Sequence, residues 1–368
     1  MGGRGGSDER AVKDRKGRVH LKNLSLEELD AFVISLGEKP FRATQLAQWL
    51  YGRGARSFGE MSDLAKAFRK KLEEMAWISF LEPAEVQTSR DGTRKYRFLL
   101  EDGEGIESVL LPERDHYTLC LSTQVGCALG CKFCLTGKRG FLRNLDQSEI
   151  IDQIIGARAT LPPEGKLTNL VLMGMGEPLE NFQNVVRALE VIRSPLGLQF
   201  SHRRVTLSTA GIIPRMEELF SRPHFVKLAI SLNAATDEQR NKLMPINRKY
   251  PLEDLLAACR KIPLAKRENI TFEYVLIRGV NDSKEDALGV ARLLRGIRAK
   301  INLIALNEHP ESSLCRPTDE AIQRFQEVLR AERFTAMVRQ SKGSDILAAC
   351  GQLGRKPGLA AKAPRSEL

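Results

Sequence analysis

The chain has 368 residues, 42% of them hydrophobic, and contains no apolar run of the roughly 18 residues that a membrane-spanning helix needs. Residues 1–18 are rich in glycine and charge and lack the apolar stretch of a secretory signal. The number of cysteines, seven, is odd, which argues against a framework of disulfides. We therefore expect a cytoplasmic protein without a membrane partner, because a reducing cytosol preserves free thiols.

The net charge of +11 predicts an anionic partner. The basic residues are scattered along the chain in short runs, such as Arg69-Lys70-Lys71, Lys138-Arg139 and Arg248-Lys249. This distribution favours a broad nucleic-acid footprint over a single groove-reading helix. A basic surface that serves only solubility is the alternative.

The first elements in chain order are helical. Residues 1–20 are predicted to be a disordered basic tail, and residues 21–82 a small helical domain that binds a partner. The first helix starts at the capping box Ser25-x-x-Glu28, and two more helices are expected over residues 41–51 and 62–75.

The pattern then changes to that of β-strands over residues 83–113. Two runs of strand type, 96–100 and 106–110, flank a turn rich in glycine and acidic residues. This arrangement predicts a β-hairpin extension.

From residue 114 to residue 345, runs of strand length alternate with amphipathic helices. The six candidate strands cover residues 118–122, 169–173, 204–208, 226–232, 270–277 and 301–306. Six β/α units predict an α/β fold with a parallel sheet and right-handed crossovers, either an open barrel or a doubly wound sheet. Residues 346–368 follow as a C-terminal segment that ends in a basic tail.

A C-x₃-C-x₂-C triplet, Cys127, Cys131 and Cys134, directly follows the candidate strand 118–122. Active centres gather at the carboxyl ends of parallel strands, where this loop is expected to lie. Three thiolates can hold an iron–sulfur cluster with one iron left open, and S-adenosylmethionine (SAM) exploits such an iron. Zinc usually takes four N or S ligands, and ordinary clusters take four cysteines, so zinc or chance clustering is the weaker interpretation.

Small polar groups follow the other candidate strands. Gly174-Met175-Gly176-Glu177 ends one strand, and its glycines allow a close backbone approach to a ligand. The residues at the ends of the remaining strands are Ser208, Ser231, Asn233 and Asn307. Each one alone is typical of a helix cap, but their shared placement favours a ligand-lining role.

The remaining cysteines differ in their surroundings. Cys120 lies in a candidate strand and Cys350 near the C-terminus, and the usual fate of such thiols is burial. Gly351 follows Cys350 in a turn-prone segment, which favours an exposed, reactive thiol there. Cys259 is interpreted as a core residue, and Cys315 is given no role.

These motifs together resemble the RlmN/Cfr family of radical SAM RNA methyltransferases over residues 20–355. The resemblance rests on the runs Thr118–Cys134, Gly174–Pro178 and Ala348–Leu353. It implies a partial (β/α)6 radical SAM barrel over 114–345, a helical RNA-binding accessory domain and a β-hairpin linker region. It also implies methylation of adenine C2 in 23S rRNA and tRNA. The near alternative is the Cfr-like methylation of C8, and a radical SAM enzyme with a non-RNA substrate or a non-catalytic RNA-binding protein is more distant.

The resemblance further implies roles for individual residues. Cys350 takes a methyl group from one SAM, a second SAM is cleaved at a [4Fe-4S] cluster held by Cys127, Cys131 and Cys134, and the methylated thiol then reacts with adenine. Cys120 closes a transient disulfide with Cys350 to release the product, and Glu107 corresponds to the proposed proton acceptor. The implied SAM contacts are Gly176, Glu177, Ser208, Ser231, Leu232, Asn233 and Asn307. The expected state is a monomer served by a low-potential electron donor such as flavodoxin or ferredoxin.

Overall fold

The computed structural model describes residue 14 and residues 16–222, 225–309 and 311–354. The predicted disordered tail, 1–20, falls mostly outside these residues, as does the predicted basic tail from residue 355 onward. Within the described ranges, every helix is too short or too polar to span a bilayer.

The front domain, residues 21–82, consists of helices and short turns. Just before it lies β1 (Val19–His20), and its own elements are η1 (Leu21–Asn23), α1 (Leu26–Ser35), α2 (Phe41–Ala47), η2 (Gln48–Arg53), η3 (Phe58–Glu60), α3 (Lys66–Met75) and β2 (Ala76–Trp77), which pairs with β1. The predicted capping box is confirmed, because the Ser25 side chain accepts from the Glu28 N–H and the Glu28 carboxylate accepts from the Ser25 N–H. The third helix begins later than the expected residue 62, since Lys66 is its first helical residue.

One ten-stranded sheet carries the rest of the chain, in the order β14-β13-β12-β11-β10-β9-β6-β5-β4-β3. The parallel part is made of β6 (Tyr117–Cys120), β9 (Leu167–Leu172), β10 (Val205–Thr209), β11 (Lys227–Ser231), β12 (Ile270–Leu276), β13 (Ala299–Ala305) and β14 (Thr335–Arg339). The six predicted strands are confirmed to within two residues at each end, whereas β14 was not predicted.

The predicted hairpin is also confirmed, as β4 (Arg94–Leu99) and β5 (Gly105–Pro112). It continues the large sheet, because β5 pairs antiparallel with β6, and β3 (Pro83–Thr88) forms the outer edge. A separate two-stranded sheet, β7 (Gln124–Gly126) with β8 (Phe141–Asn144), flanks the cysteine loop. We propose that the domain boundaries lie at residues 82, 113 and 345. The large sheet crosses the boundary at residue 113, because β5 pairs with β6.

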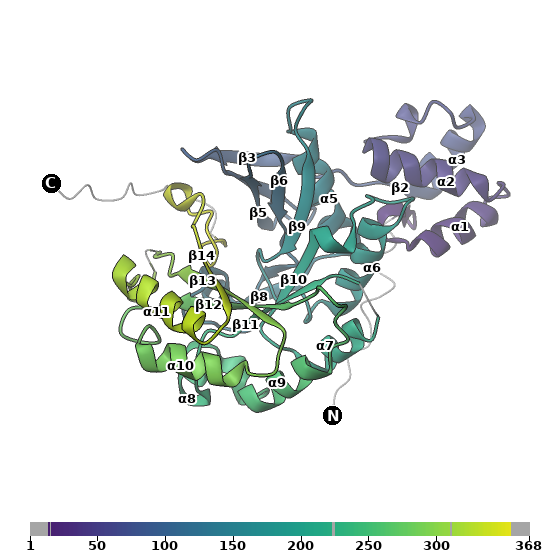
Figure 1. Cartoon of the computed structure of the whole chain (residues 1–368). Helices are drawn as coiled ribbons and strands as arrows, with labels where there is room; N and C mark the ends of the chain where they lie inside the picture. Colours follow the sequence, from purple (N-terminus) through teal and green to yellow (C-terminus); the bar gives the residue numbers. More distant parts are fainter. Residues whose placement is uncertain (1–13, 15, 223–224, 310, 355–368) are drawn as a thin grey trace.

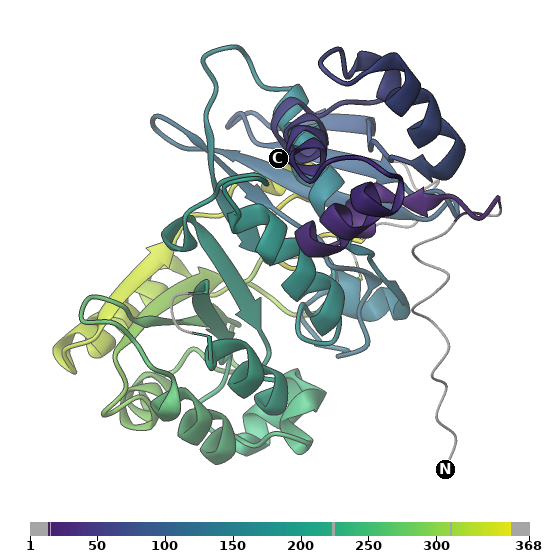
Figure 2. The same ribbon diagram turned by 90° about the vertical axis from the view of Figure 1, so that its right-hand side faces the viewer.

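Helices lie along the outer side of the curved sheet (Figure 1). The α-helices are α4 (Leu135–Arg139), α5 (Gln147–Ala159), α6 (Phe182–Arg193), α7 (Ile213–Phe220), α8 (Asp237–Leu243), α9 (Leu252–Lys261), α10 (Lys284–Leu293) and α11 (Asp319–Ala331), and the 3₁₀ turns are η4 (His202–Arg204), η5 (Pro245–Arg248) and η6 (Ser344–Ile346). The front domain (purple) and the later helices of the barrel (green) lie at opposite ends of the molecule in both views (Figures 1 and 2).

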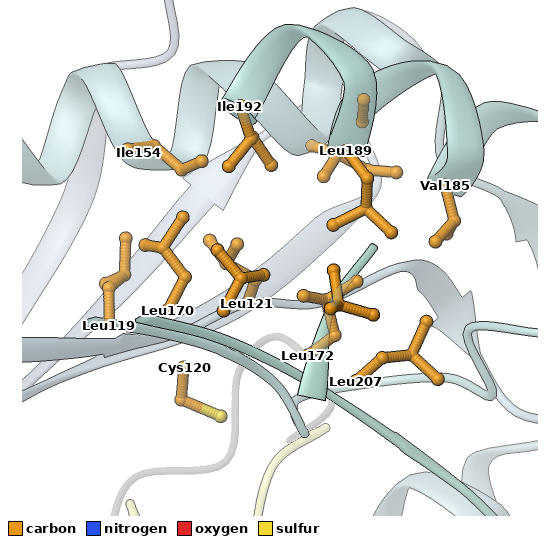
Figure 3. Close-up of a cluster of buried hydrophobic side chains, with 14 of the residues drawn as sticks. Leu119, Cys120, Leu121, Ile154, Leu170, Leu172, Val185, Leu189, Ile192 and Leu207 are labelled. Carbon is orange, nitrogen blue, oxygen red and sulfur yellow. The ribbon is translucent and has the colours of Figure 1, made fainter. Parts of the chain in front are cut away.

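Around Cys120, β6 places leucine side chains outward and the thiol inward (Figure 3). Leu119 and Leu121 point toward α5 and α6, where they meet Ile154 and Ile192, whereas Cys120 points the other way (Figure 3). Successive side chains of a strand face opposite sides of the sheet, so the register that buries the leucines also aims the Cys120 thiol into the barrel.

Candidate active site

The cysteine loop lies between β7 and α4, at the carboxyl ends of the parallel strands. Cys127, Cys131 and Cys134 are partly exposed, and all three line one cavity inside the barrel. Gly126 allows the tight entry into the loop: its φ is +80°, and a Cβ there would lie 1.8 Å from the Gly140 carbonyl oxygen. The Cys127 N–H donates to that same oxygen at 2.9 Å, which fixes the start of the loop.

The electrostatics of this loop suit a metal cluster. Burial raises the pKa of Cys127 to about 12 and raises that of Cys131 as well, so these thiols need a nearby cation to ionise. Among the described residues, no three His, Cys, Asp or Glu groups converge tightly enough to hold a single metal ion. The loop presents three thiols to one cavity, which is the donor set that an iron–sulfur cluster would use.

The predicted SAM contacts gather in the cavity of the cysteine loop, which we call the SAM cavity. Those that line it are Gly176, Glu177, Ser208, Ser231, Asn233 and Asn307. Leu232 is different, because its side chain is fully buried and its N–H donates to the Glu273 carbonyl. Any ligand contact at Leu232 therefore has to use its backbone.

The turn after β9 is held against two neighbours. The φ of Gly176 is +102°, and a Cβ there would lie 2.6 Å from the Gln124 Cβ, so glycine is required. The Glu177 carboxylate accepts from the Ala210 N–H at 2.8 Å and from the Leu179 N–H at 3.1 Å. Burial raises the pKa of Glu177 to about 7 against the effect of these bonds. The carboxylate thus connects the end of β9 to the end of β10.

Asn233 sits in the left-handed backbone region, with φ at +59°, which Asn tolerates better than most residues. Its Oδ1 accepts from the Val275 N–H at 2.8 Å, and its Nδ2 lies 3.2 Å from the Met244 sulfur. The side chain therefore holds neighbouring backbone in place at the edge of the SAM cavity.

Glu273, in the middle of β12, is a site residue that the sequence analysis missed. Its carboxylate lines the SAM cavity, with Oε2 accepting from the Ser208 hydroxyl at 2.9 Å. Oε1 has no hydrogen-bond partner among the described residues, and the Arg339 guanidinium lies 3.9 Å away. Burial raises the pKa of Glu273. In the sequence, the one feature that could have pointed to Glu273 is that it is a single carboxylate within an otherwise mostly apolar strand.

A second cavity, of about 370 Å³, adjoins the first, and we call it the thiol cavity. Cys120 and Cys350 both line it, and all cysteines of the described residues are free thiols. Its other walls include the apolar side chains Val109, Leu111, Met173, Ile304 and Val338. The volume falls in the range of about 300–1,000 Å³ that is typical of small-ligand sites.

Cys350 lies where the two cavities meet, because it lines both. Its side chain is open to solvent through them, yet the surrounding protein raises the pKa of its thiol by desolvation. Burial likewise raises the pKa of Cys120 to about 12. Arg339, on the wall of the thiol cavity, opposes both shifts with its positive charge.

Three hydrogen bonds hold the chain around Cys350 against the barrel. Asn307 Nδ2 donates to the Cys350 carbonyl at 3.0 Å, and the Leu135 N–H donates to the Gly351 carbonyl at 2.7 Å. The Thr136 hydroxyl donates to the Leu353 carbonyl at 2.7 Å. The C-terminal segment is thus attached both to Asn307, a predicted SAM contact, and to α4, the helix that follows the cysteine loop.

Glu107 is buried on β5 and contacts the C-terminal segment. Its Oε2 accepts from the Gly354 N–H at 2.7 Å, and its Oε1 lies 3.7 Å from Lys95 Nζ. Lys95 in turn donates to the Ile346 carbonyl at 2.6 Å. In this conformation Glu107 supports the segment that carries Cys350.

Two family models match the chain. The model described as the ribosomal RNA large subunit methyltransferase N-terminal domain matches residues 19–78, and the radical SAM superfamily model matches residues 121–291. These matches cover the front domain and most of the barrel, respectively.

Curated relatives and a solved structure are similar over nearly the whole chain. Dual-specificity RNA methyltransferase RlmN of Syntrophotalea carbinolica is 53% identical, over 96% of this chain and 94% of the relative. The same enzyme of Desulfosudis oleivorans is 56% identical over 85% of each chain. The crystal structure of a radical SAM methyltransferase from Sphaerobacter thermophilus matches with a TM-score of 0.86 and 42% identity, over 91% of this chain and 98% of that one. The expected radical SAM fold is confirmed.

Proposed function

The chain belongs to the RlmN family of radical SAM RNA methyltransferases, and from this premise we propose that it methylates C2 of adenine in 23S rRNA and in tRNA, with Cys350 as the carrier of the methyl group. The position of Cys350 at the junction of the SAM cavity and the thiol cavity supports this proposal most directly. A methyl carrier has to face its donor on one side and its acceptor on the other.

The radical SAM family implies a [4Fe-4S] cluster and SAM. We assign the cluster to Cys127, Cys131 and Cys134, which leaves one iron open, and we assign SAM to the cavity that these residues share with Glu177 and Ser231. When bound, the cluster supplies the electron that cleaves SAM. The protein uses two SAM molecules per turnover, one to methylate Cys350 and one to activate that methyl group.

The thiol cavity is the proposed seat of the target adenine. Its apolar walls and its volume suit a flat heteroaromatic base, and Cys120 and Cys350 both face it. Carbon C2 of adenine is electron-poor and cannot attack the methyl group of SAM as a nucleophile. The base has to leave its stack to enter the cavity, which costs a few kcal/mol, about the price of flipping one nucleotide.

Cys120 and Glu107 complete the proposed machinery. The Cys120 sulfur attacks the Cys350 sulfur and forms a transient disulfide. The bond between the Cys350 sulfur and the transferred carbon breaks, and that carbon takes up a proton as the methylated base leaves. Both thiols line the same cavity, which supports this step. Glu107 accepts the C2 proton after its bond to the Gly354 N–H opens, so proton removal is coupled to movement of the C-terminal segment.

The remaining partners are inferred from chemistry. The charge of +11 and the front domain support binding to folded RNA. We further propose that a low-potential donor, flavodoxin or ferredoxin, reduces the cluster and that the enzyme acts as a monomer.

A Cys350→Ala variant tests the carrier role. The enzyme is reconstituted anaerobically with iron and sulfide, incubated with SAM, reductant and RNA, and the RNA nucleosides are analysed by mass spectrometry. We expect 2-methyladenosine from the unmodified enzyme and none from Cys350→Ala. Cys315→Ala is the matched control, since Cys315 is exposed and lies outside both cavities, and it should retain full activity. Product formation by Cys350→Ala would refute the carrier role, and 8-methyladenosine would redirect the assignment to C8.

A further inference from the structure

Arg240 is a fully buried arginine next to the SAM cavity, and the sequence analysis did not single it out. It lies on α8, and its side chain has no exposed surface. None of the ion pairs within the described ranges includes it, so no carboxylate lies within ion-pair distance to neutralise the guanidinium. Burial of a charge without an opposite partner opposes folding, and burial lowers the pKa of Arg240 to about 10, which still leaves it charged at neutral pH.

The guanidinium binds backbone carbonyls instead of carboxylates. It donates to the carbonyls of Ala210 at 2.7 Å, Ser231 at 3.1 Å and Leu232 at 3.0 Å. A further bond reaches Asn247 Oδ1 at 2.9 Å. One side chain therefore joins the carboxyl ends of β10 and β11.

These strand ends shape the SAM cavity. Ser231 is the last residue of β11 and lines the cavity, as does Ala210 after β10. The Ala210 peptide is held from both sides, because its N–H donates to Glu177 and its carbonyl accepts from Arg240. Loss of Arg240 would release this peptide and leave three buried carbonyls with fewer donors.

Arg240 also lies close to the cluster loop. The Met244 N–H donates to the Arg240 carbonyl at 2.7 Å, and Cys131 packs on the small apolar cluster that contains Ala210 and Met244. The Lys132 N–H donates to the Leu243 carbonyl at 2.9 Å, which joins α8 directly to the loop.

Building on the proposed function, we infer that Arg240 is a positioning residue whose buried charge also makes the cluster easier to reduce. Its hydrogen bonds fix the strand ends that receive SAM. No carboxylate forms an ion pair with it among the described residues, and the Asp237 carboxylate lies one hydrogen bond further on, accepting from Asn247 Nδ2 at 2.8 Å. Reduction adds a negative charge to the cluster inside a medium of low dielectric constant. The nearby cation stabilises that added charge, so the reduction potential is higher than it would be without Arg240.

Two substitutions separate the two effects. Arg240→Lys keeps the charge but cannot reach all the carbonyls, and Arg240→Met removes both the charge and the hydrogen bonds. We expect SAM to bind about tenfold more weakly to both variants, since charged hydrogen bonds are lost in each. Only Arg240→Met should shift the reduction potential to more negative values. SAM binding is measured by equilibrium dialysis, and the potential by a redox titration followed by electron paramagnetic resonance, on the reconstituted full chain.

The control is the double variant Lys22→Met with Asp152→Leu. It removes another buried cation, one that pairs with a carboxylate at the junction of the front domain and α5, and it should change neither the potential nor SAM binding. An unchanged potential in Arg240→Met, at equal iron content, would overturn the inference. Should Arg240→Met not fold, Arg240→Lys decides the positioning role, since unweakened SAM binding to it would overturn that role. Both readouts are independent of RNA, so an enzyme that methylates no RNA but shows these shifts would refute the proposed function alone.

Discussion

The junction between the front domain and α5 and the surroundings of the SAM cavity (here called the rim) both contain buried charged side chains. At the junction the charges form an ion pair, Lys22 with Asp152, whereas at the rim Arg240 is bonded to carbonyls instead. At the junction, Lys22 Nζ lies 2.6 Å from Asp152 Oδ1 and donates to the Ser79 carbonyl at 2.7 Å, and the Ser79 hydroxyl donates to Asp152. Both ions are fully buried and neutralise each other. At the rim, Arg240 has no carboxylate partner within the described residues, and one oxygen of Glu273 accepts no hydrogen bond from them.

The difference indicates what each region is built for. At the junction, Lys22 and Asp152 neutralise each other, and their ion pair joins the front domain to α5. Around the SAM cavity, the Arg240 guanidinium is bonded to carbonyls, the Glu273 Oε1 accepts no hydrogen bond within the described residues, and burial raises the pKa of Cys131 and of Glu177. Such local departures from the rules of stable packing are expected at functional sites.

Removal of a proposed cluster ligand should have the largest effect on activity. We expect Cys127→Ala to lose the cluster and to lower methylation by more than about 1,000-fold, because two thiols cannot hold an iron cluster with one open site. Iron content and nucleoside mass spectrometry measure the two effects. The unfolding midpoint of the iron-free chain should change little, since the rim does not hold the fold together, and Cys315→Ser should retain full iron content. Normal iron content in Cys127→Ala would contradict the assignment.

Disruption of the junction should instead lower the stability of the chain. Asp152→Ala leaves Lys22 buried without its partner, which should lower the free energy of unfolding by about 3–5 kcal/mol. Urea unfolding measures this loss. The double variant Lys22→Met with Asp152→Leu should regain much of it, because an apolar pair needs no counter-charge. A single variant as stable as the unmodified chain would show that the junction does not depend on this ion pair.

Glu177 should make SAM binding depend on pH. Its pKa is raised to about 7, so the carboxyl is mostly neutral below that pH and ionised above it. If the ionised form binds the SAM ammonium group, affinity should rise about tenfold from pH 6 to pH 8. Glu177→Gln should bind more weakly and without that rise. A pH-independent affinity in the unmodified enzyme would exclude the carboxylate as the contact.

The same pKa predicts a change in stability of the ligand-free chain. The folded-state pKa is above the usual value, so the contribution of Glu177 to stability is fully present below pH 4.5 and is lost as the pH rises through about 7. The free energy of unfolding, followed from pH 5 to pH 8, should fall more in the unmodified chain than in Glu177→Gln. Parallel curves for the two chains would contradict this expectation.

The smallest effect is expected from the bond between Thr136 and Leu353. Thr136→Val removes one hydrogen bond from the C-terminal segment, a loss of about 1 kcal/mol. Hydrogen exchange in residues 348–354 should speed up by a few-fold. Thr168→Val is the matched control, since the Thr168 hydroxyl has no hydrogen-bond partner in the described part of the chain. Equal exchange in both variants would mean that other contacts hold the segment.

The sequence predicted those features that depend on local patterns. Strand periodicity located β6 and the five strands from β9 to β13 but not the short pair β7 and β8, and the cysteine spacing drew attention to the cysteine loop. The strand β14 was missed because Thr335–Arg339 is short, largely exposed and defined by its pairing with β13. Its strand character comes from a neighbour in space and is not visible in its own composition.

Long-range contacts limited the prediction of the site. No local pattern singles out Glu273 or Arg240. The fold shows that β12 turns the Glu273 side chain toward the cavity, where it accepts from Ser208, and that Arg240 on α8 donates to the Ala210 carbonyl. The resemblance named Cys350 and Glu107, but only the fold shows that Glu107 holds the segment that carries Cys350. Such contacts join parts of the chain that are far apart, and no local pattern records them.

Asn307 joins the two cavities through a single side chain. It lines the SAM cavity, and its Nδ2 donates to the Cys350 carbonyl at 3.0 Å. Any displacement of the backbone at Cys350 therefore breaks a hydrogen bond whose donor belongs to the wall of the SAM cavity, so the position of the reactive thiol and the shape of that wall depend on each other.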